Sequence, residues 1–199
     1  MSERVRKPLF TAEQPKTPAV PYTADPSAVL ESMYRQVWNT SMHDMPFVNR
    51  ALEIVAIGFR RHEGDWVGAM LTPWFLNLCL LPGGGTLWRD RGSGDRVKLQ
   101  FPAGELEFIA DYDPDGSVPA YLYFPLFQPV GQFATQESAV AAAQAALDAL
   151  FSAPAADAAK PDNPVSKADT ANPAVSSTST NSSAGLPARR AFFRRVAGR

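Results

Sequence analysis

The sequence predicts an α+β fold: a single domain with a mainly antiparallel sheet and an N-terminal and a C-terminal helix, followed by a disordered tail. Two segments in which apolar residues recur at helical spacing flank a stretch of short apolar runs separated by turn residues. All four Trp lie between residues 26 and 151, whereas residues 152–187 contain no aromatic side chain. One hydrophobic core is therefore expected, with tails on both sides.

Domain boundaries follow from this change of composition. Residues 1–25 are interrupted by prolines and are expected to form a disordered arm. Residues 26–151 are expected to form the domain, residues 152–188 a low-complexity linker, and residues 189–199 a basic C-terminal tip. The arm lacks the apolar core of a signal peptide, and no run of about 18 apolar residues occurs. The chain is therefore expected to remain in the cytoplasm.

Two helices are predicted. The first begins at Pro26, with Asp25 as its N-cap. Its core-facing residues follow i, i+3, i+4, i+7 spacing: Val29, Leu30, Met33, Tyr34, Val37 and Trp38. The second helix is predicted over Thr135–Phe151, an alanine-rich segment with Thr135 as its N-cap. Both helices are expected to pack on one face of the sheet.

The chain is organised around the apolar run Trp66–Leu81. Pro73 divides this run into two strands, Trp66–Thr72 and Phe75–Leu81, because proline cannot donate to a strand ladder. Asn77 is the polar exception in the second strand, and an unsatisfied buried carboxamide costs roughly 1–3 kcal/mol. Asn77 is therefore expected either to tie down the Pro73 corner or to face a ligand.

The remaining strands are predicted from alternation between turns: Glu53–His62, Val97–Phe101, Leu106–Ala110 and Ala120–Phe127. Residues 63–65 form an exposed charged turn rather than a metal site. Pro82–Gly85 is a wide turn, since no Lys-Ser/Thr follows the glycines as in a phosphate loop. Pro125 and Pro129 are expected to bend the last strand or to place it at an edge.

Charge is distributed unevenly along the chain. Residues 26–151 carry about six more acidic than basic side chains, which disfavours nucleic-acid binding by the domain. Five carboxylates are expected to form an acidic patch: Glu105, Glu107, Asp111, Asp113 and Asp115. The last three match the opening of a calcium loop, but the twelfth position is Leu122 instead of Glu and no flanking helices are predicted. No metal is therefore expected there.

A longer pattern resembles a known family. It comprises T-P-W-F-L-N-L-C-L-L-P-G (Thr72–Gly83), Trp88, F-P-A-G (Phe101–Gly104) and Y-F-P-L-F-Q-P-V (Tyr123–Val130). Over residues 46–151 the chain resembles the HybE/HupJ family of nickel-iron hydrogenase assembly chaperones. The resemblance implies a cytoplasmic accessory protein for hydrogenase maturation and export proofreading. Its implied partners are a hydrogenase subunit precursor and other maturation proteins. Some relatives carry a rubredoxin-like cysteine-rich module, which this sequence lacks.

The residue inventory disfavours catalysis. Only His43 and His62 could act as a histidine base, and neither lies near a nucleophile motif. Cys79 lies in an apolar strand without a neighbouring base and is expected to be inert. Together with the family resemblance, which implies the chaperone role and its partner, this inventory predicts a non-catalytic chaperone without a cofactor, which binds a hydrogenase subunit or its twin-arginine signal region. A small-ligand or cofactor-binding module with a pocket lined by aromatic residues and Asn77 is the alternative.

The partner-binding surface is predicted on the exposed edge of the Trp66–Leu81 layer, together with the acidic patch. Its candidate residues are Trp66, Thr72, Pro73, Trp74, Phe75, Asn77, Pro82, Gly83 and Trp88. If Trp74 belongs to a recognition surface, Trp74→Ala is expected to cost less than about 2 kcal/mol of stability.

The C-terminal tip carries a second signal. Arg189-Arg190-x-Phe192-Phe193-Arg194 resembles the twin-arginine motif of exported precursors, but only five residues follow Arg194, so an export signal is not expected. One hypothesis is a passive basic tail. The other is an internal mimic of the client's signal, in which the two leading arginines meet carboxylates and the two phenylalanines fill apolar pockets.

Overall fold

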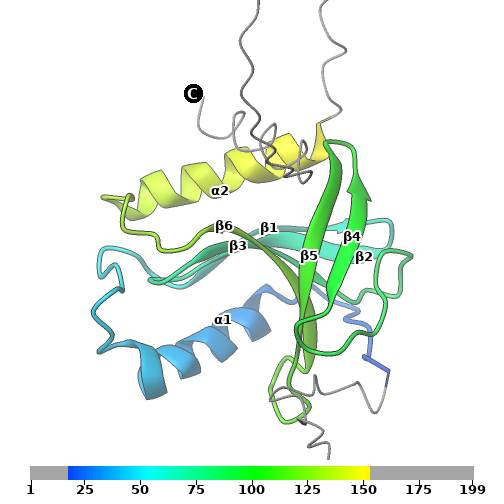
Figure 1. The fold of residues 1–199 in the computed structure, drawn as a ribbon, viewed down its shortest axis with the longest axis horizontal. Helices are drawn as coiled ribbons and strands as arrows, with labels where there is room; N and C mark the ends of the chain where they lie inside the picture. Colours follow the sequence, from blue (N-terminus) through cyan, green and yellow to red (C-terminus); the bar gives the residue numbers. More distant parts are fainter. Residues whose placement is uncertain (1–17, 153–199) are drawn as a thin grey trace, which may run out of the picture.

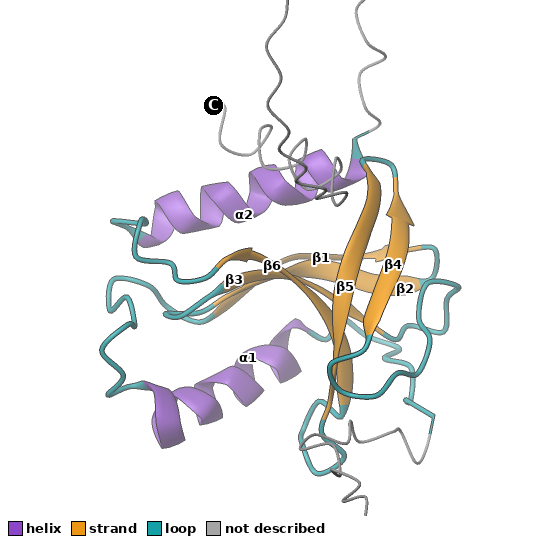
Figure 2. Cartoon of the chain, in the orientation of Figure 1, coloured by secondary structure: helices purple, strands orange, loops and turns teal. Residues whose placement is uncertain are grey.

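The computed structural model describes residues 18–152. Its elements, in order, are α1 (Ser27–Val37), the π-helical turn η1 (Trp38–Met42), β1 (Val55–His62), β2 (Asp65–Leu71), β3 (Leu76–Leu81), β4 (Arg96–Phe101), β5 (Gly104–Tyr112), β6 (Ala120–Phe127) and α2 (Gln136–Phe151). The strands form one antiparallel sheet of order β1-β2-β3-β6-β5-β4 (Figure 2). The predicted α+β fold with one helix at each end of the domain is confirmed.

The two helices cover opposite faces of the sheet (Figure 1), so the prediction that both pack on one face was wrong. Leu30 of α1 shares a core cluster with Cys79 and Leu81 of β3. Leu147 of α2 belongs to a second cluster with Leu78, which points to the other side of the same strand. All six residues of β3 are buried. A continuous apolar run of this kind needs cover on both faces, because successive side chains point to opposite sides.

The strand order also places the apolar run in the interior of the sheet. β2 and β3 each pair with a strand on both sides, and the edges are β1 and β4. The prediction of a binding surface on an exposed edge of Trp66–Leu81 was therefore wrong. β6 is likewise an inner strand despite Pro125, which lies opposite Asn77 beside a register shift in the ladder. The alternative that Pro125 places this strand at an edge was therefore wrong, and the ladder shifts its register beside Pro125 instead.

The predicted start of α2 is confirmed, whereas α1 starts one residue later than predicted, at Ser27 with Pro26 as its N-cap. The Asp25 carboxylate accepts a hydrogen bond from the Ser27 backbone N–H at 2.8 Å, one residue ahead of the structural N-cap, Pro26. Thr135 caps α2: its side chain accepts from the Ser138 backbone N–H at 3.2 Å, and the Ser138 hydroxyl accepts from the Thr135 N–H.

Asp65 is fully buried, which corrects its assignment to an exposed turn. One carboxylate oxygen accepts from the N–H groups of Gly83 and Gly85, and the other from those of Leu87 and Trp88, at 2.8–3.0 Å. A Cβ at Gly85 would collide with the carbonyl oxygen of Glu63. The glycines therefore allow the loop to lie directly against the β1–β2 turn, and four backbone donors compensate the buried carboxylate.

Residues 18–25 pack against the domain, whereas the sequence assigned them to a disordered arm. The Tyr22 N–H donates to the Pro82 carbonyl at 2.8 Å, and the Tyr22 carbonyl accepts from Trp66 Nε1 at 2.9 Å and from Arg61 at 3.0 Å. This segment is therefore tied to the same end of the sheet as the Asp65 loop. Residues 1–17, the linker beyond residue 152 and the tip lie outside the described residues.

Candidate functional site

A groove runs between α1 and the part of the sheet that α1 leaves uncovered. It consists of two adjoining clefts of about 240 and 430 Å³. The smaller cleft is lined by aromatic and amide side chains: Trp74, Phe75, Asn77, Tyr123 and Gln128. The larger cleft lies between α1 and the β5–β6 turn, and its walls include Met33, Val37, Thr40, Asp113, Asp115 and Val118. Both clefts share Tyr34, Asp111 and Tyr121.

The shared wall is a chain of hydrogen bonds that links the helix to the sheet. The Tyr34 hydroxyl of α1 donates to the Tyr121 hydroxyl of β6 at 2.8 Å. The Tyr121 hydroxyl donates to Asp111 Oδ2 of β5 at 2.6 Å. Burial raises the pKa of both tyrosines well above the ordinary value, and the nearby Asp111 carboxylate adds to the shift. Both hydroxyls therefore stay protonated, and both protons point along the chain toward Asp111.

Asn77 lines the smaller cleft from β3. Its side chain is 5% exposed, and Oδ1 is buried without a hydrogen-bond partner among residues 18–152. The Pro73 corner is instead held by Thr72, whose hydroxyl accepts from the N–H groups of Trp74 and Phe75 at 3.3 and 3.0 Å. Of the two roles predicted for Asn77, tying down the corner is thus performed by Thr72.

Trp74 contributes to the core as well as to the cleft. It is 7% exposed, stacks on Trp38 with ring centroids 6.1 Å apart, and meets the edges of Tyr34 and Phe75. Removing a Trp this deeply buried costs about 3–5 kcal/mol. Trp74→Ala is therefore expected to cost more than the limit of about 2 kcal/mol of stability that was given for a Trp74 that belongs only to a recognition surface.

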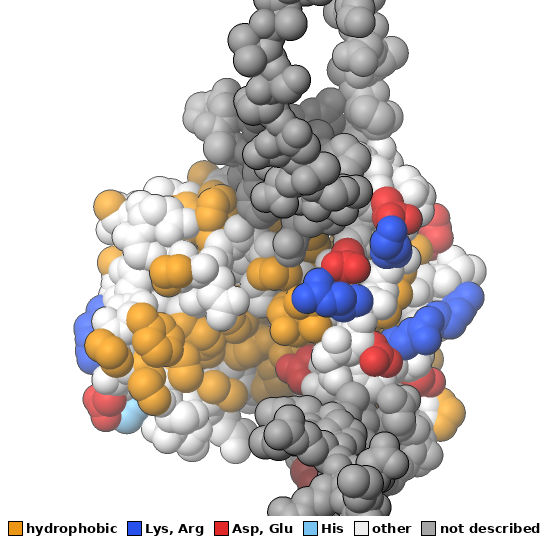
Figure 3. Space-filling model, viewed as in Figure 1, with side chains coloured by type: hydrophobic (Ala, Val, Ile, Leu, Met, Phe, Trp, Pro, Cys, Tyr) orange, Lys and Arg blue, Asp and Glu red, His pale blue; other side chains and the backbone are white. Residues whose placement is uncertain are grey.

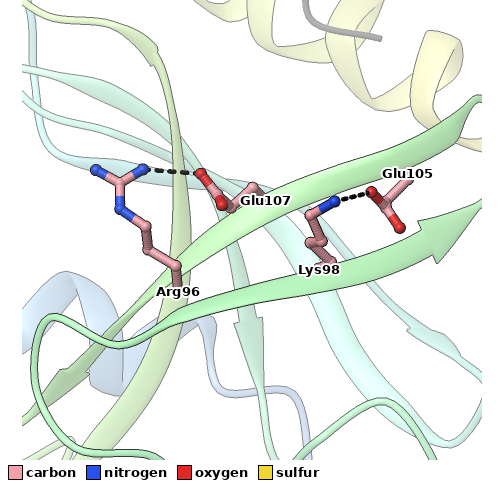
Figure 4. Close-up of polar contacts among 4 residues, drawn as sticks. All are labelled: Arg96, Lys98, Glu105 and Glu107. Carbon is pink, nitrogen blue, oxygen red and sulfur yellow. Dashed lines mark hydrogen bonds and ion pairs between the residues drawn. The ribbon is translucent and has the colours of Figure 1, made fainter. Parts of the chain in front are cut away.

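The predicted acidic patch is divided by ion pairs (Figure 4). Glu105 pairs with Lys98, and Glu107 pairs with Arg96, each at 2.8 Å. Both bases come from β4, the strand that pairs with β5, so they were missed when acids and bases were counted along the sequence. Figure 3 shows the result: acidic and basic side chains alternate over β4 and β5, whereas hydrophobic side chains gather over α1 and the adjoining sheet.

The three aspartates of the patch are the ones that line the groove: Asp111, Asp113 and Asp115. Asp113 and Asp115 are exposed on the β5–β6 turn, where the Asp113 side chain accepts from the Asp115 N–H at 3.1 Å. The acidic end of the groove therefore lies beside α1, next to the apolar side chains of Met33 and Val37.

The predicted partner-binding residues fall at two ends of the β2–β3 hairpin. Near the corner lie Thr72, Pro73, Trp74, Phe75 and Asn77, whereas Trp66, Pro82, Gly83 and Trp88 lie beside the buried Asp65. Only the first set adjoins the groove. Tyr121 and Tyr123 also line the groove, although they were not predicted to do so. Their alternation in β6 was the available signal, since both point to the face that carries Asp111.

The titratable side chains considered for catalysis lie apart from one another. His43 contacts Asp44 on the surface, and His62 packs against Phe101 and Phe151. Cys79 is buried, and burial raises the pKa of its thiol to about 12. Within residues 18–152, no group of three or more His, Cys, Asp or Glu side chains is arranged to hold a metal ion. None of the described helices combines the length and the apolar character needed to cross a membrane.

The fold and the groove together define an α+β protein that presents an aromatic and acidic concave surface. The family model for the [NiFe]-hydrogenase assembly chaperone HybE matches residues 25–195, and the chain belongs to this family. The resemblance found in the sequence is thereby confirmed.

Relatives with hydrogenase-related names support this assignment. The chain is 40% identical over 126 residues to a protein of Rhodobacter capsulatus named probable rubredoxin HupJ, in 63% of this chain and 45% of that protein. It is 38% identical over 124 residues to the hydrogenase expression/formation protein HupJ of Bradyrhizobium diazoefficiens. These residues cover 62% of this chain and 70% of that protein. The chain thus spans less than half the length of the R. capsulatus relative.

The solution structure of HybE from Escherichia coli has a similar fold. The TM-score is 0.55 with 24% sequence identity, over 80% of this chain and 96% of that chain. A rubredoxin iron site takes four cysteine thiolates, which the single Cys79 of this sequence does not supply.

Proposed function

We propose that the groove binds the precursor of a [NiFe]-hydrogenase subunit at its twin-arginine signal region. The observation that carries this proposal is the polarity of the groove. The carboxylates of the β5–β6 turn, which form no ion pair with another residue of the described range 18–152, stand at one end, and aromatic side chains from the Pro73 corner stand at the other. A signal region offers the complementary sequence, a pair of arginines followed by apolar residues.

The carboxylates and the apolar side chains of the larger cleft supply different parts of the recognition. Asp113 and Asp115 are exposed, so their attraction for a basic peptide acts mainly on the association rate and weakens with added salt. Met33, Val37 and Tyr34 offer an apolar strip along α1, where the side chains that follow the arginines would be removed from water. Affinity would come mainly from this second contact.

The test is equilibrium binding of a fluorescent hydrogenase small-subunit signal peptide to the full chain. Asp113→Asn with Asp115→Asn removes two groove carboxylates. Glu105→Gln with Glu107→Gln removes the same charge from carboxylates that are already paired with Lys98 and Arg96. We expect the aspartate pair to weaken binding about tenfold at low salt, and the glutamate pair to change it less than about twofold.

Equal weakening by both pairs would mean that net charge alone attracts the peptide and that the groove is not the binding site. Absence of peptide binding by the unmodified protein would contradict the proposal. A retained small molecule detected by mass spectrometry of the same preparation would then favour the small-ligand alternative.

A further inference from the structure

We infer that the smaller cleft of the groove is a guanidinium site, in which Asn77 and Asp111 accept hydrogen bonds from one arginine side chain held against the aromatic wall. The inference deepens the proposed function and rests on it for the identity of the peptide that brings the arginine.

The first observation is the unpartnered carboxamide of Asn77. Its Oδ1 is buried in an inner strand between Leu76 and Leu78, and no described residue donates to it. A buried acceptor without a donor is costly and rare in folded proteins. Because Asn77 also lines the cleft, rotation of its carboxamide would turn this oxygen toward a donor brought by a ligand, without any change in the protein backbone.

The second observation is the direction of the hydroxyl protons. Tyr34 donates to Tyr121, and Tyr121 donates to Asp111, so both protons are used within the wall. The oxygen of Tyr34 retains free lone pairs, since no described residue donates to it. Within the described part of the chain, Asp111 Oδ1 has only a long 3.5 Å contact with the Ser93 hydroxyl. The wall therefore presents acceptors, and it favours a ligand that carries donors alone.

The third observation is charge. Among the described residues that line the smaller cleft, Asp111 is the one that carries a formal charge. Burial raises the pKa of Tyr34, Tyr121 and Tyr123, so their hydroxyls remain neutral. An anionic ligand would meet the Asp111 carboxylate without a compensating base in the lining. The cleft is therefore suited to a cation.

Shape separates a guanidinium from an ammonium. A guanidinium is planar, offers five N–H donors and no acceptor, and stacks on aromatic faces, whereas an ammonium is a compact and strongly hydrated charge. Trp74, Phe75 and Tyr123 line the same cleft as the two acceptors. An arginine can thus donate to Asn77 and Asp111 while its plane lies against a ring.

The first arm of the experiment exchanges the arginines of the signal peptide for lysines. The unmodified protein is expected to prefer the arginine peptide by about tenfold, the effect of one charge-assisted hydrogen bond. Asn77→Leu is expected to reduce this preference to less than about twofold. Asp111→Asn is expected to weaken both peptides. Cys79→Ala, two residues along the same face of β3, is the matched control and should keep the preference.

The second arm needs neither a peptide nor a variant. Agmatine and cadaverine are titrated into the unmodified full chain, and NMR follows the side-chain amide of Asn77 and the indole N–H of Trp74. Agmatine is expected to shift both signals in a saturable manner, and cadaverine to shift neither at the same concentration.

The two arms separate failure of the inference from failure of the proposed function. If the precursor peptide binds but lysine replaces arginine without loss, and agmatine leaves Asn77 unmoved, the guanidinium site is overturned and the groove function stands. If agmatine binds at Asn77 while no signal peptide binds, the site stands and its proposed partner is wrong. An arginine preference that survives in Asn77→Leu would also overturn the inference.

Discussion

Replacing Asn77 with leucine is expected to stabilise the folded protein, although the same change is expected to impair binding. The Asn77 carboxamide is 5% exposed and its Oδ1 has no partner among the described residues, so folding removes it from water without compensation. Such a group costs about 1–3 kcal/mol. Leucine has a similar volume and matches the flanking residues of β3, which limits strain. A gain of about 1–2 kcal/mol in the free energy of unfolding is therefore expected.

Urea denaturation followed by Trp fluorescence measures this free energy, and a domain of this size should melt about 3–8 °C higher. Asn77→Ala is the control, because it also removes the carboxamide but leaves a cavity, so it should be less stable than the leucine variant by about 2–5 kcal/mol. A leucine variant that is less stable than the unmodified protein, at an unchanged m-value, would refute the reasoning. It would mean that the carboxamide makes a stabilising contact in the folded state.

Three other changes to the protein have expected outcomes. Asp65→Asn should lower the free energy of unfolding by about 3 kcal/mol or more, measured by urea denaturation, because an NH₂ group would face two of the four backbone donors that the carboxylate now accepts. Cys79→Ala should leave hydrogenase maturation intact in a complementation assay. The unmodified protein should lose up to about 4 kcal/mol of stability as the pH rises from 9 to about 12, because its folded form keeps a thiol proton that the unfolded chain releases near pH 9. Cys79→Ala should abolish this loss. Truncation after Leu186 should tighten the binding of a signal peptide.

Local patterns predicted most elements of the fold because each pattern is read within one segment. The alternation of Leu106, Phe108 and Ala110 marks β5, and Thr135 marks the start of α2. The placement of the helices on opposite faces was implied by the same local evidence. The uninterrupted apolar residues of β3 indicate a strand buried on both sides, which a sheet covered on one face cannot provide.

The parts that could not be predicted depend on contacts between distant segments. Asp65 looks like a turn residue until the loop of Gly83–Trp88 folds back over it and supplies its donors. Glu105 and Glu107 look unpaired until β4 pairs with β5 and brings Lys98 and Arg96 opposite them. In both cases a carboxylate is compensated by groups of a distant segment that the fold brings next to it. The neighbouring residues in the sequence do not reveal these partners.

The strand topology also gives the truncation prediction a geometric basis. The end of α2 lies beside the start of β5, since the Ala103 N–H donates to the Leu150 carbonyl at 3.1 Å. From there β5 leads to Asp111 in the groove, about seven residues or roughly 23 Å away. A linker of about 36 residues with the composition of residues 153–188 is expected to span about 33 Å, which is enough to bring the tip to the groove at a millimolar-scale effective concentration.

The tip carries Arg189, Arg190, Phe192 and Phe193, the same pairing of arginines and apolar residues that the groove is proposed to bind. If the tip competes for the groove, the truncated protein should bind a signal peptide several-fold more tightly, and the gain should shrink as salt rises. Arg189→Ala with Arg190→Ala should reproduce the gain, whereas Arg199→Ala, which changes charge outside the motif, should not. Unchanged or weaker binding after truncation at low salt would reject the competing mimic and leave the tip as a recruiting arm or a passive tail. A gain that Arg199→Ala also produced would assign the effect to net charge, because the groove would then not distinguish the motif from any other basic segment.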